Sequence, residues 1–186
     1  SLSYIYEFVA ISDKAEISVS SFRYPSLQKD SDIILFFNFL GVSTKFNNDN
    51  ITIKKFNNSL PILIEWDVLN NPDLMPTYLV SCFALGVDLK LKGIESLAYK
   101  ESNRLQSVKC NLEKFNAKIR INNNSLILNS TNSLFVEREI DTYGDHRIAL
   151  AFSPLVIKTK SLKINNPQVV EKSYPKYWNH LNKMGI

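Results

Sequence analysis

A short stretch near the middle of the chain, YKESNRLQ at 99–106, carries three charged side chains within five positions. Lys100 and Arg104 are cations, and Glu101 beside them is a carboxylate that could give or take a proton. Because the stretch opens an amphipathic segment, the same charges could also decorate a helix surface, with Glu101 favouring the helix dipole and Arg104 pairing with it. The elements around this stretch decide whether its charges form an anion-binding site or an ordinary charged helix surface.

Two further segments combine charged side chains with signals for the start of a helix. Asp73 lies in NNPDLMPTY (70–78), and Asp145 precedes His146 and Arg147 in YGDHRIAL (143–150). Capping a helix would by itself explain each aspartate. His146, beside a buried helix, would ordinarily be a packed, hydrogen-bonded histidine. With two histidines and no cysteine cluster, a metal site is not expected.

The bulk composition limits the function classes. The chain has 186 residues, 45% hydrophobic and 22% charged, with a net charge of +4, as in an ordinary globular protein that could bind an anion. No run of five or six basic residues indicates a nucleic-acid surface. Cys82 and Cys110 lack CxxC spacing and favour buried free thiols in a reducing compartment. We find no signal peptide and no membrane-spanning run. The opening without Met, inside a structured-looking segment, indicates a fragment.

An internal repeat organises the chain. FLGVSTKFNNDNITI (39–53) and KFNAKIRINNNSLIL (114–128) align without a gap, each reading as a helix end, a strand, an Asn-rich turn and a second strand. Gly41 and Asn116 occupy the position of a left-handed helix cap. The final segment, 177–186, repeats the helix end a third time, with Gly185 at the cap.

Upstream of each copy, apolar periodicity predicts the other elements of the repeat. Buried helices are expected at 4–12, 77–86 and 146–157, strands at 15–22, 88–94 and 161–165, and second helices at 31–40, 102–115 and 175–184. One face of the second helix at 102–115 carries a stripe of Leu105, Val108, Leu112 and Phe115. We therefore predict an α/β (α+β) fold. Three units, about 1–60, 61–130 and 131–186, form a single lobe around a pseudo-threefold axis.

The repeat brings the charged residues into equivalent places. A lysine precedes the second helix in all three units, at Lys29, Lys100 and Lys172, while Ser3, Asp73 and Asp145 precede the first helix. Equivalent positions of pseudo-symmetric units lie at one end of a lobe, where helix N-termini also point. Such a face favours phosphate and carboxylate ligands.

The segments LAYKESNRL (97–105), GDHRIALAF (144–152) and VEKSYPKYWNHLNKMG (170–185), in this order and spacing, resemble the C-terminal lobe of the EPSP synthase (3-phosphoshikimate 1-carboxyvinyltransferase) family. SLSY (1–4), SLQKDSD (26–32) and PDLMPT (72–77) are similar to further segments of that family. The resemblance covers residues 1–186. It implies a two-lobed enzyme with three βαβαββ-type units in each lobe and the active site between them, of which the N-terminal lobe is absent here.

The resemblance also implies an activity. The family transfers the carboxyvinyl group of phosphoenolpyruvate to the 5-hydroxyl of 3-phosphoshikimate and releases phosphate, without metal or cofactor. This is a step of the shikimate pathway to chorismate and the aromatic amino acids. The resemblance further implies that the parent enzyme is cytoplasmic and monomeric and binds neither nucleic acid nor membrane. The missing lobe would be the necessary partner, and the isolated lobe is expected to be inactive.

Individual roles follow from the same resemblance. Asp73 corresponds to the base that takes the hydroxyl proton, and Glu101 to the acid that protonates the enol carbon. The residues matching contacts to 3-phosphoshikimate are Asp73, Ser96 and Lys100, and those matching contacts to phosphoenolpyruvate are Arg104, Arg147 and Lys172. Lys29 replaces a family glycine and Ala98 a frequent arginine, so we expect altered substrate affinity or lobe packing rather than altered chemistry.

Two alternatives remain open from the sequence. UDP-N-acetylglucosamine enolpyruvyl transferase shares the fold and the enol-ether chemistry, but the ordered Lys-Glu-Ser-x-Arg and Asp-His-Arg motifs favour the shikimate enzyme. A non-catalytic anion- or RNA-binding module of the same repeat would carry basic and aromatic residues together on its strands. The alternating strands show no such clustering.

Overall fold

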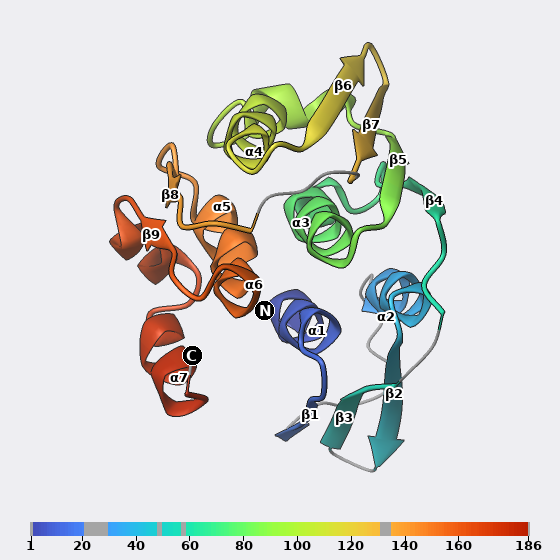
Figure 1. Ribbon diagram of the computed structural model, residues 1–186, viewed down its shortest axis with the longest axis vertical. Coiled ribbons are helices and arrows are strands. Elements are labelled where there is room, and N and C mark those ends of the chain that lie inside the picture. Colours follow the sequence, from blue (N-terminus) through green and yellow to red (C-terminus); the bar gives the residue numbers. More distant parts are fainter. Residues whose placement is uncertain (1, 21–29, 48–49, 57–58, 131–134, 186) are drawn as a thin grey trace.

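The computed structural model describes residues 2–20, 30–47, 50–56, 59–130 and 135–185. Three helices form the centre of the molecule: α1 (Leu2–Ile11), α3 (Met75–Leu85) and α5 (His146–Phe152) pack against one another (Figure 1). All three sequences are apolar on nearly every side, which is the pattern of a helix surrounded by protein. The predicted buried helices are therefore confirmed as the core.

The second helices lie farther out and bury one face each. They are α2 (Asp30–Phe39), α4 (Arg104–Glu113) and α7 (Tyr177–Lys183). The predicted stripe is confirmed, because Leu105, Val108, Leu112 and Phe115 are all buried. Cys82 is a buried free thiol in α3, but the prediction of a buried Cys110 was wrong. Cys110 is exposed because its position on α4 falls opposite the apolar stripe.

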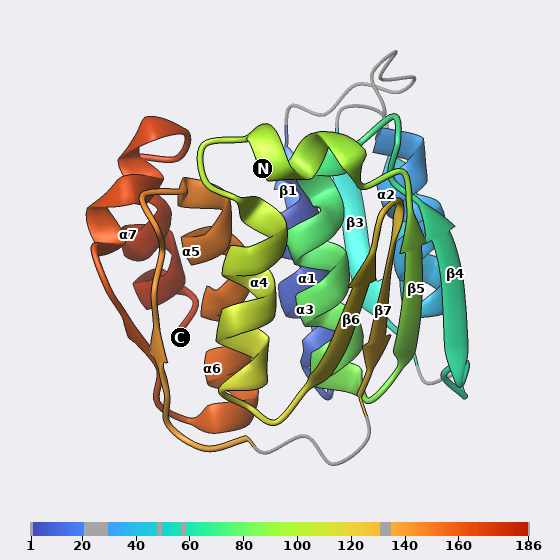
Figure 2. The ribbon, with the colours of Figure 1, turned by 90° about the horizontal axis from the view of Figure 1, so that it is seen from above.

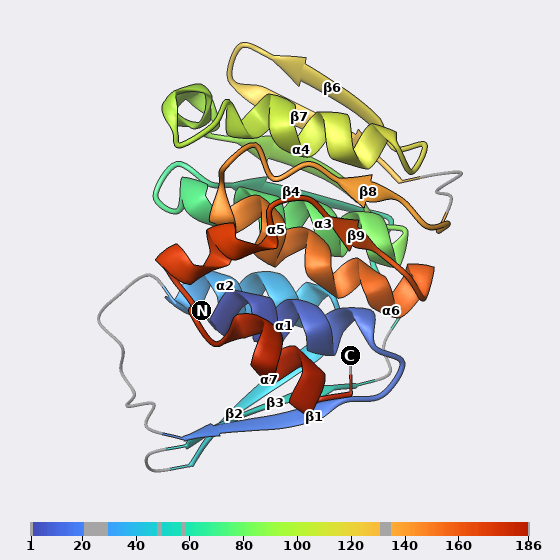
Figure 3. The same ribbon diagram turned by 90° about the vertical axis from the view of Figure 1, so that its left-hand side faces the viewer.

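In the described part of the chain, three sheets surround the central helices. The first, of order β1-β3-β2, contains β1 (Glu16–Ser20), β2 (Val42–Asn47) and β3 (Asn50–Lys55), all antiparallel. The second has the order β4-β5-β7-β6, with β4 (Leu63–Asp67), β5 (Asp88–Lys92), β6 (Lys118–Asn122) and β7 (Ser125–Asn129). The third pairs β8 (Glu139–Ile140) with β9 (Lys163–Ile164) and lies in front of α5 and α6 in Figure 3. The order β1-β3-β2 matches β5-β7-β6, as the aligned repeat segments require.

Two strands, β4 and β8, were not predicted from the sequence. Both pair in parallel, β4 with β5 from Leu63 opposite Asp88 onward and β8 with β9. Strand β8 is only two residues long, and β4 opens with two adjacent apolar residues, Leu63 and Ile64, so neither shows a clean alternation of apolar and polar residues. They are the strands that precede α3 and α5.

The helix predicted at 146–157 is interrupted. Helix α5 ends at Phe152, a 3₁₀ turn, η3, covers Ser153–Leu155, and α6 (Val156–Thr159) follows. Pro154 explains the break, because proline has no N–H to donate and its ring clashes with the preceding turn.

The predicted helix caps are confirmed. Gly41, Asn116 and Gly185 have φ angles of 78°, 66° and 79°. The second hairpin turns between Asn122 and Ser125, as predicted. Residues 48–49 of the first hairpin turn and Lys29 lie outside the described residues. The proposed unit boundaries near 60 and 130 remain a prediction.

Three more 3₁₀ segments matter for the site: η1 (Pro72–Leu74), η2 (Glu95–Tyr99) and η4 (Pro167–Lys172). The helices run side by side in Figure 2, and the N-terminus lies at the same end of the molecule as the start of α4. Among the described residues, none of the helices is both long and apolar enough to traverse a lipid bilayer.

Candidate active site

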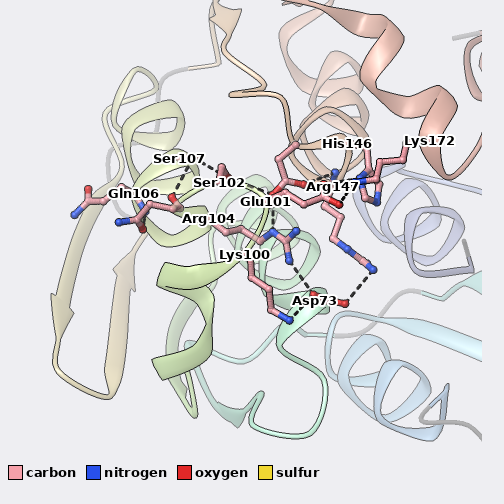
Figure 4. Close-up of polar contacts among 12 residues, drawn as sticks. Asp73, Lys100, Glu101, Ser102, Arg104, Gln106, Ser107, His146, Arg147 and Lys172 are labelled. Carbon is pink, nitrogen blue, oxygen red and sulfur yellow. Dashed lines mark hydrogen bonds and ion pairs between the residues drawn. The ribbon is translucent and has the colours of Figure 1, made fainter.

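Six of the seven predicted site residues lie close together at the end of the molecule where α4 starts (Figure 4). They come from η1, from the η2–α4 connection, from the first residue of α4, from the first turn of α5 and from the end of η4. They are Asp73, Lys100, Glu101, Arg104, Arg147 and Lys172. The exception is Ser96, which is exposed on η2 and has no recorded contact with the other six among the described residues. Four cations therefore surround two carboxylates.

Asp73 is the carboxylate on which three of the cations meet. Arg104 Nη1 donates to its Oδ1 at 2.8 Å, Arg147 Nη2 lies 3.0 Å from its Oδ2, and Lys100 Nζ lies 3.5 Å from Oδ1. Partial burial tends to raise the pKa of Asp73, but Arg147, Lys100 and Arg104 together hold it below its ordinary value. Asp73 is thus ionised at neutral pH and able to accept a proton or a hydrogen bond.

Arg104 is almost fully buried, with 2% of its side chain exposed. Its Nε donates to Oδ2 of Asp145 at 2.8 Å, and Asp145 is itself completely buried. Burial lowers the pKa of this guanidinium, but its bonds to Asp145 and Asp73 outweigh burial and raise the pKa. Arg104 therefore pairs with Asp145 and Asp73, two carboxylates from distant segments, instead of forming the helix-surface pair with Glu101.

Asp145 is confirmed as the N-cap of α5. Its Oδ1 accepts a hydrogen bond from the backbone N–H of Arg147 at 2.9 Å. Its Oδ2 also accepts the Ser102 hydroxyl at 3.2 Å, and the Ser107 hydroxyl donates to Ser102 at the same distance. At the start of α4, the side chain of Asn103 accepts from the N–H of Gln106. These contacts join the start of α4 to the start of α5.

Glu101 contacts a nitrogen-bearing side chain on each of two sides. Its Oε1 accepts from Lys172 Nζ, and its Oε2 lies 3.0 Å from Nδ1 of His146. The pKa of Glu101 is lowered, chiefly by the hydrogen bond from Lys172 and further by His146, against a smaller opposing effect of burial. The sequence indicated a packed, hydrogen-bonded His146, which is confirmed, but not that its partner is Glu101. The sequence signal for a functional role of His146 was its place beside Arg147 in the Asp-His-Arg motif.

A pocket of about 250 Å³ adjoins Asp73 and Arg147. Its lining includes Ser3 at the start of α1 and Asn71 just before η1. The predicted convergence of Ser3 with Asp73 is therefore confirmed. A polar ligand in this pocket would touch both a carboxylate and a guanidinium.

One cluster has the residue types of a metal site. Glu101, Asp145 and His146 each offer a ligand atom within 4.8 Å of the others. All three are already engaged, however: Glu101 by Lys172 and His146, and Asp145 by Arg104. The surrounding cations repel a metal ion and already occupy these carboxylate oxygens, so this cluster is a network of ion pairs rather than a ready metal site.

Comparison with known proteins gives the family of the chain. A family model described as EPSP synthase (3-phosphoshikimate 1-carboxyvinyltransferase) matches residues 1–181, and the chain belongs to this family of enzymes. A 3-phosphoshikimate 1-carboxyvinyltransferase of Bacteroides fragilis strain YCH46 is 36% identical over 188 residues, covering 99% of this chain and 45% of the relative. One of Methanoculleus marisnigri is 26% identical, covering 100% of this chain and 43% of the relative.

Solved structures share the fold. EPSP synthase of Acinetobacter baumannii superposes with a TM-score of 0.78 at 18% identity, over 98% of this chain and 44% of that one. The enolpyruvyl transferase NikO of Streptomyces tendae superposes with a TM-score of 0.70 at 13% identity, over 100% of this chain and 43% of that one. The predicted mixed α/β fold class is confirmed. The chain spans somewhat less than half the length of the relatives it matches.

Proposed function

We propose that this chain forms one half of the active site of an enzyme that transfers the carboxyvinyl group of phosphoenolpyruvate to the 5-hydroxyl of 3-phosphoshikimate. The observation that supports this best is the cluster of four cations around Asp73 and Glu101 at one end of the lobe. The relatives carry the name of this activity and are about twice as long. The rest of the site would come from the other lobe, and this lobe alone would be inactive.

Phosphoenolpyruvate carries a carboxylate and a phosphate, and the accessible cations suit both groups. Arg147 is 30% exposed and Lys172 64% exposed, so each can reach a ligand from the position it holds. A guanidinium binds a carboxylate with two parallel hydrogen bonds, whereas an ammonium serves a phosphate as a point charge. Arg104 is buried and would contribute its fixed charge and its hold on Asp73.

The pocket beside Asp73 suits a polar cyclic ligand such as 3-phosphoshikimate. The ionised Asp73 can accept a hydrogen bond from a ring hydroxyl, and Lys100 lies within reach of the same region. The role of Ser96 toward this substrate stays a prediction, since it makes no contact with the cluster among the described residues.

The reaction assigns opposite proton transfers to the two carboxylates. Asp73 takes the proton of the 5-hydroxyl while the hydroxyl oxygen bonds to C2 of phosphoenolpyruvate. At the same time C3 receives a proton from Glu101 and becomes a methyl group. The resulting tetrahedral adduct then returns a methyl proton to the Glu101 carboxylate and expels its phosphate, and the double bond re-forms as an enol ether. The lowered pKa of Asp73, with burial outweighed by Arg147, Lys100 and Arg104, keeps it in the unprotonated form that a base requires, although the same cations make it a weaker proton acceptor.

Glu101 requires a change of state before it can act as the acid. Its pKa is lowered without substrate, chiefly by Lys172, so it begins as a carboxylate. Phosphoenolpyruvate bound beside Lys172 would compete for that ammonium and add negative charge next to Glu101. Both effects raise the pKa of a carboxyl group. Glu101 would thus become protonated only when the substrate is present, with His146 holding its other oxygen.

The test is phosphate release by the full-length enzyme that contains this lobe, with both substrates supplied. Glu101→Gln should lower turnover by about 10²- to 10⁴-fold with a nearly unchanged KM for phosphoenolpyruvate. Glu113→Gln is the matched control, because Glu113 is an exposed residue of α4 paired only weakly with Lys109. A near-normal rate for Glu101→Gln would remove it as the acid. Absence of release by the unmodified enzyme would overturn the proposal.

A further inference from the structure

We infer that Asp145 is a positioning residue that orients both arginines of the phosphoenolpyruvate subsite, an inference that rests on the proposed function. Asp145 is fully buried, and its carboxylate accepts three hydrogen bonds. One comes from the side chain of Arg104, one from the backbone of Arg147 and one from the Ser102 hydroxyl. A single carboxylate thus contacts both arginines without facing solvent.

The contact with Arg104 fixes the plane of its guanidinium. Nε donates to Asp145 at 2.8 Å and Nη1 donates to Asp73 at 2.8 Å, so two nitrogens of one rigid group are held from different segments. A planar group held at two nitrogens has one orientation. Without Asp145 the guanidinium could rotate about its bonds while still facing Asp73.

The contact with Arg147 works through the backbone. As the N-cap of α5, Asp145 determines where the first turn of that helix begins, and Arg147 stands in this turn. From there the Arg147 guanidinium reaches Oδ2 of Asp73 at 3.0 Å. The start of α5 and the start of α4 are therefore tied together at the Asp145 carboxylate.

Charge makes this role specific to an aspartate. Arg104 has 2% of its side chain exposed, so solvent cannot replace the charge of Asp145 if that charge is lost. Asparagine keeps the shape and the capping ability of the residue, since both amino acids are favoured N-caps. Asp145→Asn therefore removes the charge-assisted bond to Arg104 while retaining the start of α5.

The experiment measures steady-state kinetics of the full-length enzyme carrying Asp145→Asn. We expect KM for phosphoenolpyruvate to rise about 10- to 100-fold, the equivalent of one lost charged hydrogen bond. Turnover at saturation and KM for 3-phosphoshikimate should change by no more than about threefold. Asp141→Asn is the control, because Asp141 precedes α5 on the same segment but pairs with Lys114 and Asn165 away from the cluster. It should leave both KM values unchanged.

A double-mutant cycle with Arg104→Lys separates positioning from a general loss of stability. If Asp145 acts through Arg104, the double variant should bind phosphoenolpyruvate no worse than Arg104→Lys alone. Additive losses, or an unchanged KM in a folded Asp145→Asn enzyme, would overturn the inference while leaving the proposed function intact. An unmodified enzyme that does not use phosphoenolpyruvate would overturn both.

If Asp145→Asn does not fold, guanidinium NMR of the unmodified protein decides instead. The Arg104 Nε–H should exchange slowly with water and keep its position when phosphoenolpyruvate is added, because Asp145 holds it in a buried bond. Rapid exchange of that proton would show that Asp145 does not hold the guanidinium, and the inference would fail.

Discussion

The Oε2 atom of Glu101 lies 3.0 Å from Nδ1 of His146, although 45 positions of sequence separate the two residues. The contact joins the segment before α4 to the first turn of α5. With Lys172 on its other oxygen, Glu101 is held from two sides by groups of the last third of the chain. This arrangement makes the ionisation of Glu101 measurable through the stability of the lobe.

The stability contributed by Glu101 should depend on pH. Its pKa in the folded state lies below the ordinary value of 4.5, so its contribution is present above that value and is lost as the pH falls through the lower folded pKa. Glu101→Gln should therefore reduce the free energy of unfolding near neutrality and lose its effect in strong acid. Urea unfolding at several pH values measures this difference. A gap that stays constant with pH would contradict it.

Glu7 should show the opposite dependence. It is completely buried in α1, and neither of its carboxylate oxygens has a hydrogen-bond partner among the described residues. Burial raises its pKa well above the ordinary value of 4.5. Stability is then full below the unfolded pKa and declines as the pH rises toward the folded pKa.

Glu7→Gln should remove that decline, because glutamine fills the same space without a charge. The variant should be more stable than the unmodified chain at alkaline pH and nearly equal to it in acid. Unfolding curves of the two proteins between about pH 4 and 9 test this. Parallel stability profiles would show that Glu7 does not titrate across this range.

Gly93 should tolerate no side chain. It follows β5 with φ of 72°, and a Cβ there would lie 2.5 Å from both Asp67 Oδ1 and the backbone nitrogen of Leu69. Gly93→Ala should cost about 3 kcal/mol or more, the sum of a left-handed backbone and a clash with a neighbouring loop. Gly86 has the same φ with nothing within 4 Å, so Gly86→Ala should cost only about 1 kcal/mol. Equal losses in thermal unfolding would refute the steric argument.

Lys55 should stabilise the ends of two helices. Its Nζ donates to the carbonyl oxygens of Ala10 at 2.7 Å and Leu40 at 3.0 Å, in the last turn of α1 and just beyond α2. Lys55→Met should lower the free energy of unfolding by about 1 to 3 kcal/mol. The neighbouring Lys54 pairs with Glu16 on the surface, and Lys54→Met should cost under about 0.5 kcal/mol. Similar losses for the two variants would count against this capping role.

Residues whose roles are local could be predicted from sequence. The stripe from Leu105 to Phe115, the caps at Gly41 and Asn116 and the N-cap at Asp145 all depend on neighbours within a few positions. The convergence of Asp73 with Lys100 was also predicted, but only because the repeat placed the turns before the first and second helices of all units at one end of the lobe.

The partners of buried charges could not be predicted. Arg104 pairs with Asp145 across 41 positions, and nothing in the residues around Arg104 distinguishes that partner from the nearby Glu101. The short strands β4 and β8 were missed for a related reason, since parallel pairing depends on a strand that lies beyond an intervening helix. Tertiary packing decides such contacts.

An amide NMR titration of this chain with phosphoenolpyruvate, repeated with Arg147→Ala, tests most directly whether this end of the lobe is a preformed half-site. We predict shifts confined to the neighbourhoods of Lys100, Glu101, Arg104, Arg147 and Lys172, and their loss in the variant. Absence of shifts at about 1 mM ligand, or equal shifts with Arg147→Ala, would contradict a preformed anion site in this lobe.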